Sequence, residues 1–271
     1  MYEVKANGVR LHCELTGDGA PLVFVHGMCG RGGVWAGQVE RLSDEFTCVT
    51  YDRRGHGSSS DGDIPHSVPL HGDDFAALVT ELGLGPVIYV GSSGGARIGL
   101  DVVLRHPELL AGAALSEPPV FSLNPEGAKE FMARVVPAVQ PRLDADDLPG
   151  AVDAFFDVVC PGLWRRLDES AKQPYRQSGP MLVADLGQPP FVVTPGDLAA
   201  VRLPVLGIVG LHSDPFLRST PRVIAESIPS AQLVELSDSG HVTYAEQPDA
   251  FAAAVRTFAH QVFHPEGLPT A

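Results

Sequence analysis

Residues 87–104 read VIYVGSSGGARIGLDVVL: an apolar run, a turn of glycine and serine, and a helical pattern. The apolar run is typical of a parallel strand that is buried on both faces. The turn Gly91-Ser92-Ser93-Gly94-Gly95 has the G-x-S-x-G spacing, in which small neighbours permit a strained central serine. The Ser93 hydroxyl then projects above the strand ends, beside a helix N-terminus that favours developing negative charge. Ser93 is therefore a candidate nucleophile, and a turn without chemistry is the alternative for this motif taken alone.

Apolar runs and helical patterns alternate on both sides of this motif. Strands are predicted at 9–15, 21–25, 47–51, 87–91, 109–115, 205–210 and 231–236, and helices at 70–83, 95–106 and 246–262. Strands that alternate with helices indicate a parallel or mostly parallel sheet covered on both faces. The predicted fold class is therefore α/β.

Residues 118–200 interrupt the alternation. They contain many proline pairs between short helical patterns such as AVDAFFDVV, and no convincing buried strand. Apolar side chains such as Phe155, Phe156 and Trp164 disfavour a disordered loop, because they would be left in water. We predict a core made of residues 1–118 and 200–264, a helical insertion at 119–199, and a frayed tail at 265–271.

Three further motifs follow predicted strands. His26-Gly27-Met28 follows the strand at 21–25, and its turn directs the Met28 N–H, together with the Gly94 N–H, toward an oxyanion. Asp52-Arg53-Arg54-Gly55-His56-Gly57-Ser58-Ser59 is interpreted as a structural turn. Ser239-Gly240-His241 follows the last strand, where a histidine can lie over the sheet end. His241 is therefore the candidate general base.

Seven of the other histidines are interpreted as residues without a catalytic role. His26 is expected to be a structural hydrogen-bonding group, and His56 is not expected to be catalytic. His66, His71, His106, His260 and His264 are interpreted as surface or turn residues. A metal site at His66, His71 and Asp73 is disfavoured because the residues lack HExxH spacing. We predict no metal and no organic cofactor.

Composition excludes several classes of protein. The 271 residues carry 33 acidic and 19 basic side chains, a net charge of −14 that argues against nucleic acid and anionic membrane partners. Four cysteines without a CxxC pair indicate neither a disulfide framework nor structural zinc. No signal peptide or membrane-spanning run is apparent, so we expect a cytoplasmic protein, either a monomer or a homodimer.

Taken together, the HG pair, the D-x-R-G-x-G-x-S turn, the G-x-S-x-G-G elbow and the late G-H pair resemble the α/β-hydrolase superfamily. The resemblance covers essentially the whole chain and implies an eight-stranded-type sheet with residues 119–199 as a helical cap. Within this superfamily, the chain is similar to the branch that uses a serine nucleophile. By this resemblance Ser93 is the nucleophile, His241 the general base, and Met28 and Gly94 the oxyanion donors. The stretch 91–119 also resembles zearalenone-type lactonases.

The resemblance leaves two acids open for the third member of the triad. The commoner family position is third after the glycine that follows the strand at 205–210. Ser213 stands there, and Asp214 comes one residue late. Glu117, at the end of the strand at 109–115, is the alternative that some branches use. Adjacent strands lie only about 4.8 Å apart, so either carboxylate could reach His241. The register slip at Asp214 favours Glu117.

The expected function is a serine hydrolase that cleaves an ester or lactone of a mainly apolar small molecule through an acyl-enzyme. Trp164, Phe155 and Met132 are the candidate substrate-binding side chains of the cap. Two alternatives stay open: a carbon–carbon bond hydrolase on the same triad, and a receptor-like binding protein with a slow triad. Substrate identity and pathway are not predicted.

Overall fold

A sheet of eight strands forms the centre of the molecule, and the computed structural model describes residues 2–264. The strands are β1 (Tyr2–Ala6), β2 (Val9–Thr16), β3 (Ala20–Val25), β4 (Phe46–Tyr51), β5 (Val87–Ser92), β6 (Leu110–Ser116), β7 (Val205–Gly210) and β8 (Ala231–Leu236). Their spatial order is β1-β2-β4-β3-β5-β6-β7-β8. β2 pairs antiparallel with β1 and β4, and the strands from β4 to β8 pair in parallel. The predicted mostly parallel α/β sheet is confirmed.

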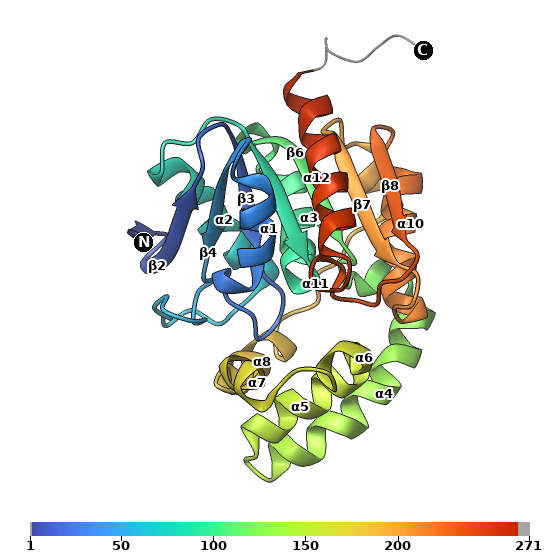
Figure 1. Cartoon of the computed structure of the whole chain (residues 1–271). Coiled ribbons are helices and arrows are strands. Elements are labelled where there is room, and N and C mark those ends of the chain that lie inside the picture. The colour runs from blue at the N-terminus through green and yellow to red at the C-terminus, as the bar shows by residue number, and fades with distance from the viewer. Residues whose placement is uncertain (1, 265–271) are drawn as a thin grey trace.

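Helices cover both faces of this sheet (Figure 1). They are α1 (Ala36–Leu42), α2 (Val68–Glu81), α3 (Gly94–Arg105), α10 (Pro215–Ser227), the short α11 (Thr243–Glu246) and α12 (Pro248–Phe263). Along β3, Val23 and Val25 pack in a core with residues of α2 and α3, while Leu22 and Phe24 pack in another with residues of α1 and α12. Because successive side chains point to opposite faces and both faces are dry, the strand is apolar throughout.

The segment between β6 and β7 is helical. It contains α4 (Pro125–Asp144), α5 (Leu148–Val159), α6 (Pro161–Trp164), α7 (Glu169–Arg176), α8 (Gly179–Leu186) and α9 (Pro195–Ala199). Figure 1 shows α4 to α8 gathered beyond one end of the sheet. An apolar cluster that includes Phe131, Phe155 and Trp164 holds these helices together and reaches Phe216 of α10. We call residues 119–199, which contain these helices, the helical insertion.

Some elements were not predicted from the sequence. β1 is an edge strand with mostly exposed side chains, and α1 and α10 are helices that each bury one face. α4 continues through Pro137 and Pro141, where prolines had indicated breaks. Among residues 2–264 no helix is long and apolar enough to cross a membrane. The predicted tail at 265–271 lies outside the described residues.

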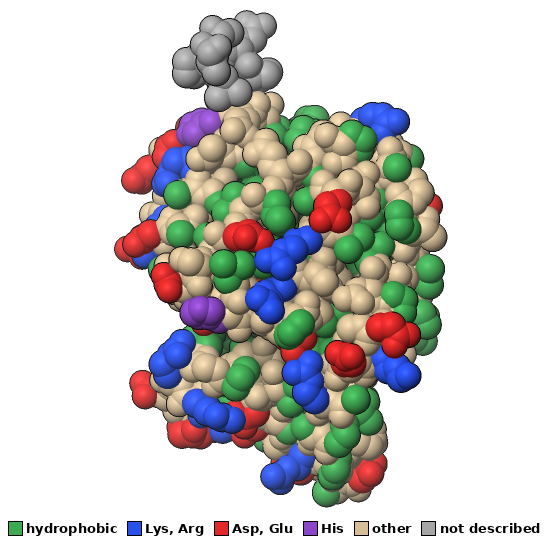
Figure 2. Space-filling view, turned by 90° about the vertical axis from the view of Figure 1, so that its right-hand side faces the viewer, with side chains coloured by type: hydrophobic (Ala, Val, Ile, Leu, Met, Phe, Trp, Pro, Cys, Tyr) green, Lys and Arg blue, Asp and Glu red, His purple; other side chains and the backbone are tan. Residues whose placement is uncertain are grey.

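Charged side chains of both signs are mixed on the molecular surface where it is shown in space-filling form. Figure 2 shows one face of the molecule, with acidic and basic groups interspersed among apolar ones. That face therefore carries no continuous basic patch, in line with the excess of acidic side chains in the chain.

Candidate active site

The turn between β5 and α3 holds Ser93 in a conformation that few side chains adopt. Ser93 has φ 55° and ψ −122°, in the region that favours glycine, and its N–H donates to the Ser116 carbonyl at 2.8 Å. A Cβ on Gly95 would lie 2.2 Å from the Val25 carbonyl oxygen, so only glycine allows this close approach of the turn to β3. The glycines of the G-x-S-x-G motif therefore permit a turn that is strained at Ser93 and tightly packed against β3.

His241 follows β8 and meets Glu117, which follows β6. The Nδ1 atom of His241 lies 2.6 Å from Oε2 of Glu117, and both side chains are buried. Glu117 also has a positive φ of 46°. The Nε2 atom of His241 is buried and has no hydrogen-bond partner within residues 2–264. When Nδ1–H donates to the carboxylate, Nε2 carries the free lone pair that a base needs.

Two further groups fix the Glu117 carboxylate. Its Oε1 accepts from the Gly210 N–H at 2.8 Å, and its Oε2 accepts from the Ser213 hydroxyl at 2.6 Å. Ser213 stands at the position where the family resemblance implies an acid, and here it supports an acid that comes from another strand. A carboxylate without exposure to water needs such partners, because burial removes its hydration.

Asp214 does not contact His241. It is the N-cap of α10, where its Oδ1 accepts from the Phe216 N–H at 2.9 Å, and its Oδ2 accepts from Arg134 of α4. Of the two candidate acids, only Glu117 lies against the histidine. The loop after β7 places Ser213 inward and leaves Asp214 to begin the next helix.

The candidate oxyanion donors, Met28 and Gly94, lie close together. A Cβ on Gly94 would be 3.5 Å from the Met28 nitrogen. Neither backbone N–H donates to another group of residues 2–264, since Gly94 is the first residue of α3 and Met28 lies in a turn. Two free N–H groups beside Ser93 can bind the oxygen of a tetrahedral intermediate.

Ser93 and His241 line two adjoining cavities of different size. The large cavity has a volume of about 580 Å³, and Met132, Phe155 and Met28 are among its walls. The small cavity has a volume of about 60 Å³ and is lined by Trp164, Tyr175 and Tyr244, and also by Phe155. Of the predicted substrate-binding residues, Met132 and Phe155 lie on the large cavity and Trp164 lies on the small one. Trp164 also stacks on Phe156, with ring centroids 4.5 Å apart.

The turn after β4 is structural, as expected. The Asp52 carboxylate accepts from the N–H groups of Gly32 and Ser58, each at 2.7 Å. His26 accepts from the Arg53 N–H at Nε2 and lies 2.8 Å from the Gly27 carbonyl at Nδ1. Burial lowers the pKa of His26 well below its ordinary value. A neutral imidazole with both nitrogens engaged is a structural group, so the expected role of His26 is confirmed.

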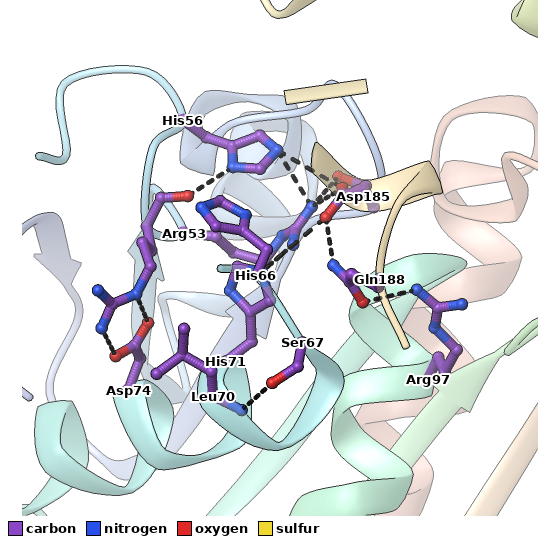
Figure 3. Close-up of polar contacts among 12 residues, drawn as sticks. Arg53, His56, His66, Ser67, Leu70, His71, Asp74, Arg97, Asp185 and Gln188 are labelled. Carbon is purple, nitrogen blue, oxygen red and sulfur yellow. Dashed lines mark hydrogen bonds and ion pairs between the residues drawn. The ribbon is translucent and has the colours of Figure 1, made fainter. Parts of the chain in front are cut away.

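Arg53 of this turn joins the sheet to the helical insertion (Figure 3). Its guanidinium lies 2.9 Å from Oδ2 of Asp185 in α8, and both side chains are buried. His56 and His71 face the same carboxylate. Burial lowers the pKa of His56 to about 3 and that of His71 well below its ordinary value. Both imidazoles are therefore neutral near pH 7.

The prediction that His66 and His71 are surface or turn residues was wrong. Both are buried, and with Asp185 they form a group whose possible ligand atoms lie within 4.8 Å of one another. Asp73 is not part of this group and instead pairs with Arg105. The Arg53 guanidinium lies 3.4 Å from Nε2 of His71, so a positive charge already stands where a metal ion would bind.

Comparisons with known proteins identify the family of this chain. A family model described as the alpha/beta hydrolase family matches residues 22–254, and the chain belongs to this family. A putative carbamate hydrolase, RutD, of Rhizobium rhizogenes is 28% identical over 265 residues, which cover 92% of this chain and 97% of the relative. A pimeloyl-[acyl-carrier protein] methyl ester esterase of Stenotrophomonas maltophilia is 26% identical over 257 residues, which cover 92% and 96%.

A solved structure gives the same result for the fold. A thermophilic esterase from Thermogutta terrifontis, with malate bound, superposes with a TM-score of 0.79 at 25% identity, covering 97% of this chain and 99% of that chain. The chain is therefore a hydrolase of the α/β type. Sequence reasoning had not found the support of Glu117 by Ser213, the pairing of Arg53 with Asp185, or the presence of Arg97 in the large cavity.

Proposed function

We propose that this chain is a serine hydrolase that cleaves carboxylic esters or lactones through an acyl-enzyme. The observation that carries the proposal is the position of His241, whose Nδ1 contacts Glu117 at 2.6 Å while its unpartnered Nε2 lies on the cavities that Ser93 also lines. A base with one nitrogen oriented by a carboxylate and the other free suits proton transfer from a serine hydroxyl.

The reaction then follows from these atoms. His241 Nε2 takes the proton of the Ser93 hydroxyl as Oγ of Ser93 bonds to the carbonyl carbon of the substrate. The π electrons of that carbonyl move to the carbonyl oxygen, which becomes an oxyanion. The N–H groups of Met28 and Gly94 stabilise that oxyanion, each by about 3 kcal/mol in the transition state. The intermediate expels the alkoxide, which receives the proton from His241. A water molecule, deprotonated by the same imidazole, then releases the acid and restores the Ser93 hydroxyl.

The unequal cavities support a substrate with one large side and one small side. The walls of the large cavity are mainly apolar, and residues of α4 and α5 provide many of them. We therefore propose that residues 119–199 act as a cap that selects an apolar substrate. The relatives named above include no zearalenone-type lactonase, so resemblance at that level is not supported.

An ester panel tests the proposal. Purified protein and its Ser93→Ala variant are assayed with methyl esters, aryl acetates and lactones, and both proteins are treated with a fluorophosphonate probe. We expect turnover and labelling by the wild-type protein, and neither by the variant. A carbon–carbon bond hydrolase would instead turn over vinylogous diketones and spare the esters, and a receptor-like protein would stop after a few turnovers.

A further inference from the structure

Arg97 lies on α3 one turn beyond Ser93 and lines the large cavity. Its N–H donates to the Ser93 carbonyl at 2.9 Å, so its position relative to the nucleophile is set by a rigid helical turn. One turn of helix advances about 5.4 Å. A charged side chain at this place lies among walls formed largely by phenylalanine, valine, proline and methionine.

The Arg97 guanidinium has few hydrogen-bond partners, although it lies among apolar walls. Among residues 2–264 its side chain makes a single hydrogen bond, from Nη2 to Oε1 of Gln188 at 3.1 Å (Figure 3). Its Nε is buried and has no partner, and no carboxylate of these residues lies within ion-pair distance. Burial lowers the pKa of Arg97. The Arg97 side chain as a whole is half-buried. A guanidinium nevertheless stays charged in proteins, and a charge largely withdrawn from water without a counter-ion is costly.

Asp185 also borders the cavity, but its carboxylate is already paired with Arg53. Its Oδ2 accepts from Arg53 at 2.9 Å, and its Oδ1 accepts from the Gln188 amide at 2.7 Å. His56 and His71, which face it, are neutral because burial lowers their pKa. The Arg53 guanidinium pairs with this carboxylate, and the Arg97 guanidinium is linked to it through Gln188, so Arg53, Arg97 and Asp185 together have a net charge of +1.

We infer that Arg97 binds a carboxylate of the substrate, so that the enzyme takes esters or lactones that carry a free carboxylate at the far end of an apolar chain. This inference rests on the proposed ester hydrolysis at Ser93. A planar guanidinium pairs in a forked geometry with a carboxylate, and one unbalanced positive charge matches one negative charge better than a dianionic phosphate monoester. The apolar walls fit the methylene groups between the two ends.

Two rival explanations of Arg97 are testable. Arg97 could only anchor Gln188, in which case the charge of the substrate would not matter. Lys129 of α4 also lines the cavity and is exposed, so it could attract an anion instead. Exposed charges interact weakly with ligands at physiological salt, because solvent and ions screen them. We therefore expect Lys129→Gln to change substrate preference much less than Arg97→Gln.

The experiment compares matched substrates. Monomethyl succinate, glutarate, adipate and pimelate are each assayed against the methyl ester of the monocarboxylic acid with the same number of carbons. The readout is the ratio of kcat/KM for the charged ester to that for the neutral ester. We expect the wild-type ratio to exceed about 10 for at least one chain length, and Arg97→Gln to lower it by about 10- to 100-fold. Arg97→Lys should restore part of the ratio. The control variant Arg202→Gln, at an exposed residue that does not line the cavity, should leave the ratio unchanged.

A binding arm separates this inference from the proposed reaction. Titration calorimetry of the Ser93→Ala variant with monomethyl adipate and methyl hexanoate measures charge preference without turnover. Preferential binding of the charged ester without hydrolysis by the wild-type protein would overturn the proposed reaction and keep the carboxylate site. Hydrolysis with no preference for a charged ester at any chain length would overturn the carboxylate site and keep the reaction. The wild-type ratio decides this even if an Arg97 variant does not fold.

Discussion

The replacement Glu117→Gln tests whether the carboxylate at the end of β6 orients the base. The amide has nearly the same volume, so the buried site keeps its packing. The Gly210 N–H, now 2.8 Å from Oε1, needs an acceptor and therefore holds the amide oxygen. The amide NH₂ then faces Nδ1 of His241, at the place of an oxygen that lies 2.6 Å away. It must donate to Nδ1, which moves the imidazole proton to Nε2.

A protonated Nε2 in a neutral ring cannot accept the Ser93 proton. We expect kcat to fall by about 10⁴-fold, the loss typical when a triad base is held in the wrong tautomer. At about 1.4 kcal/mol for each factor of ten, this loss is about 5 kcal/mol of transition-state stabilisation. The melting temperature should change by only a few degrees, because the cavity is neither emptied nor overfilled.

The assay measures kcat on a hydrolysed ester for Glu117→Gln and, in parallel, for Asp214→Asn. Asparagine is also a good N-cap, and the ion pair of Asp214 with Arg134 is partly exposed, so Asp214→Asn should stay within about threefold of the wild-type protein. Near-wild-type activity of Glu117→Gln together with a severe loss in Asp214→Asn would refute the assignment.

Three further predictions concern neighbouring groups. Ser213→Ala removes one charge-assisted hydrogen bond from Glu117 and should lower kcat about 10-fold, measured on the same ester; an unchanged kcat would contradict the support role. Trp164→Phe should enlarge the small cavity and raise kcat/KM for bulkier esters relative to small ones, and an unaltered profile would show that Trp164 only packs. Since His26, His56 and His71 have lowered pKa values, the unfolded chain binds more protons below about pH 6.5, and the free energy of unfolding by urea should fall from pH 7 to pH 5. Equal or greater stability at pH 5 would contradict that protonation balance.

The fold could be predicted because its signals are local. The elbow around Ser93 is a strand, a turn and a helix within 18 residues. At position 95 the close approach to β3 leaves no room for a side chain, so glycine is required there. The runs that became β3, β5 and β7 are apolar because both faces of the sheet are covered. β1 was not predicted because it lies at the edge of the sheet, where most of its side chains are exposed.

Site residues could be predicted where a motif or the end of a predicted strand marks them. Ser93 and His241 follow strands within recognisable turns, whereas Arg53 and Asp185 are 132 residues apart and nothing in either segment indicates the partner. The prolines of α4 misled because buried side chains such as Val135 and Val139 hold that helix in place despite its lost hydrogen bonds. Tertiary packing of this kind leaves no signal in a short window.

In the proposed reaction, Ser93 forms a covalent acyl intermediate. A rapid-quench experiment with the wild-type protein and a p-nitrophenyl ester, followed by peptide mass analysis, detects this intermediate. We expect a burst of p-nitrophenolate close to one equivalent of enzyme and an acyl adduct on the peptide that contains Ser93, both absent in Ser93→Ala. An adduct on another residue, or steady turnover by Ser93→Ala, would contradict the proposed reaction.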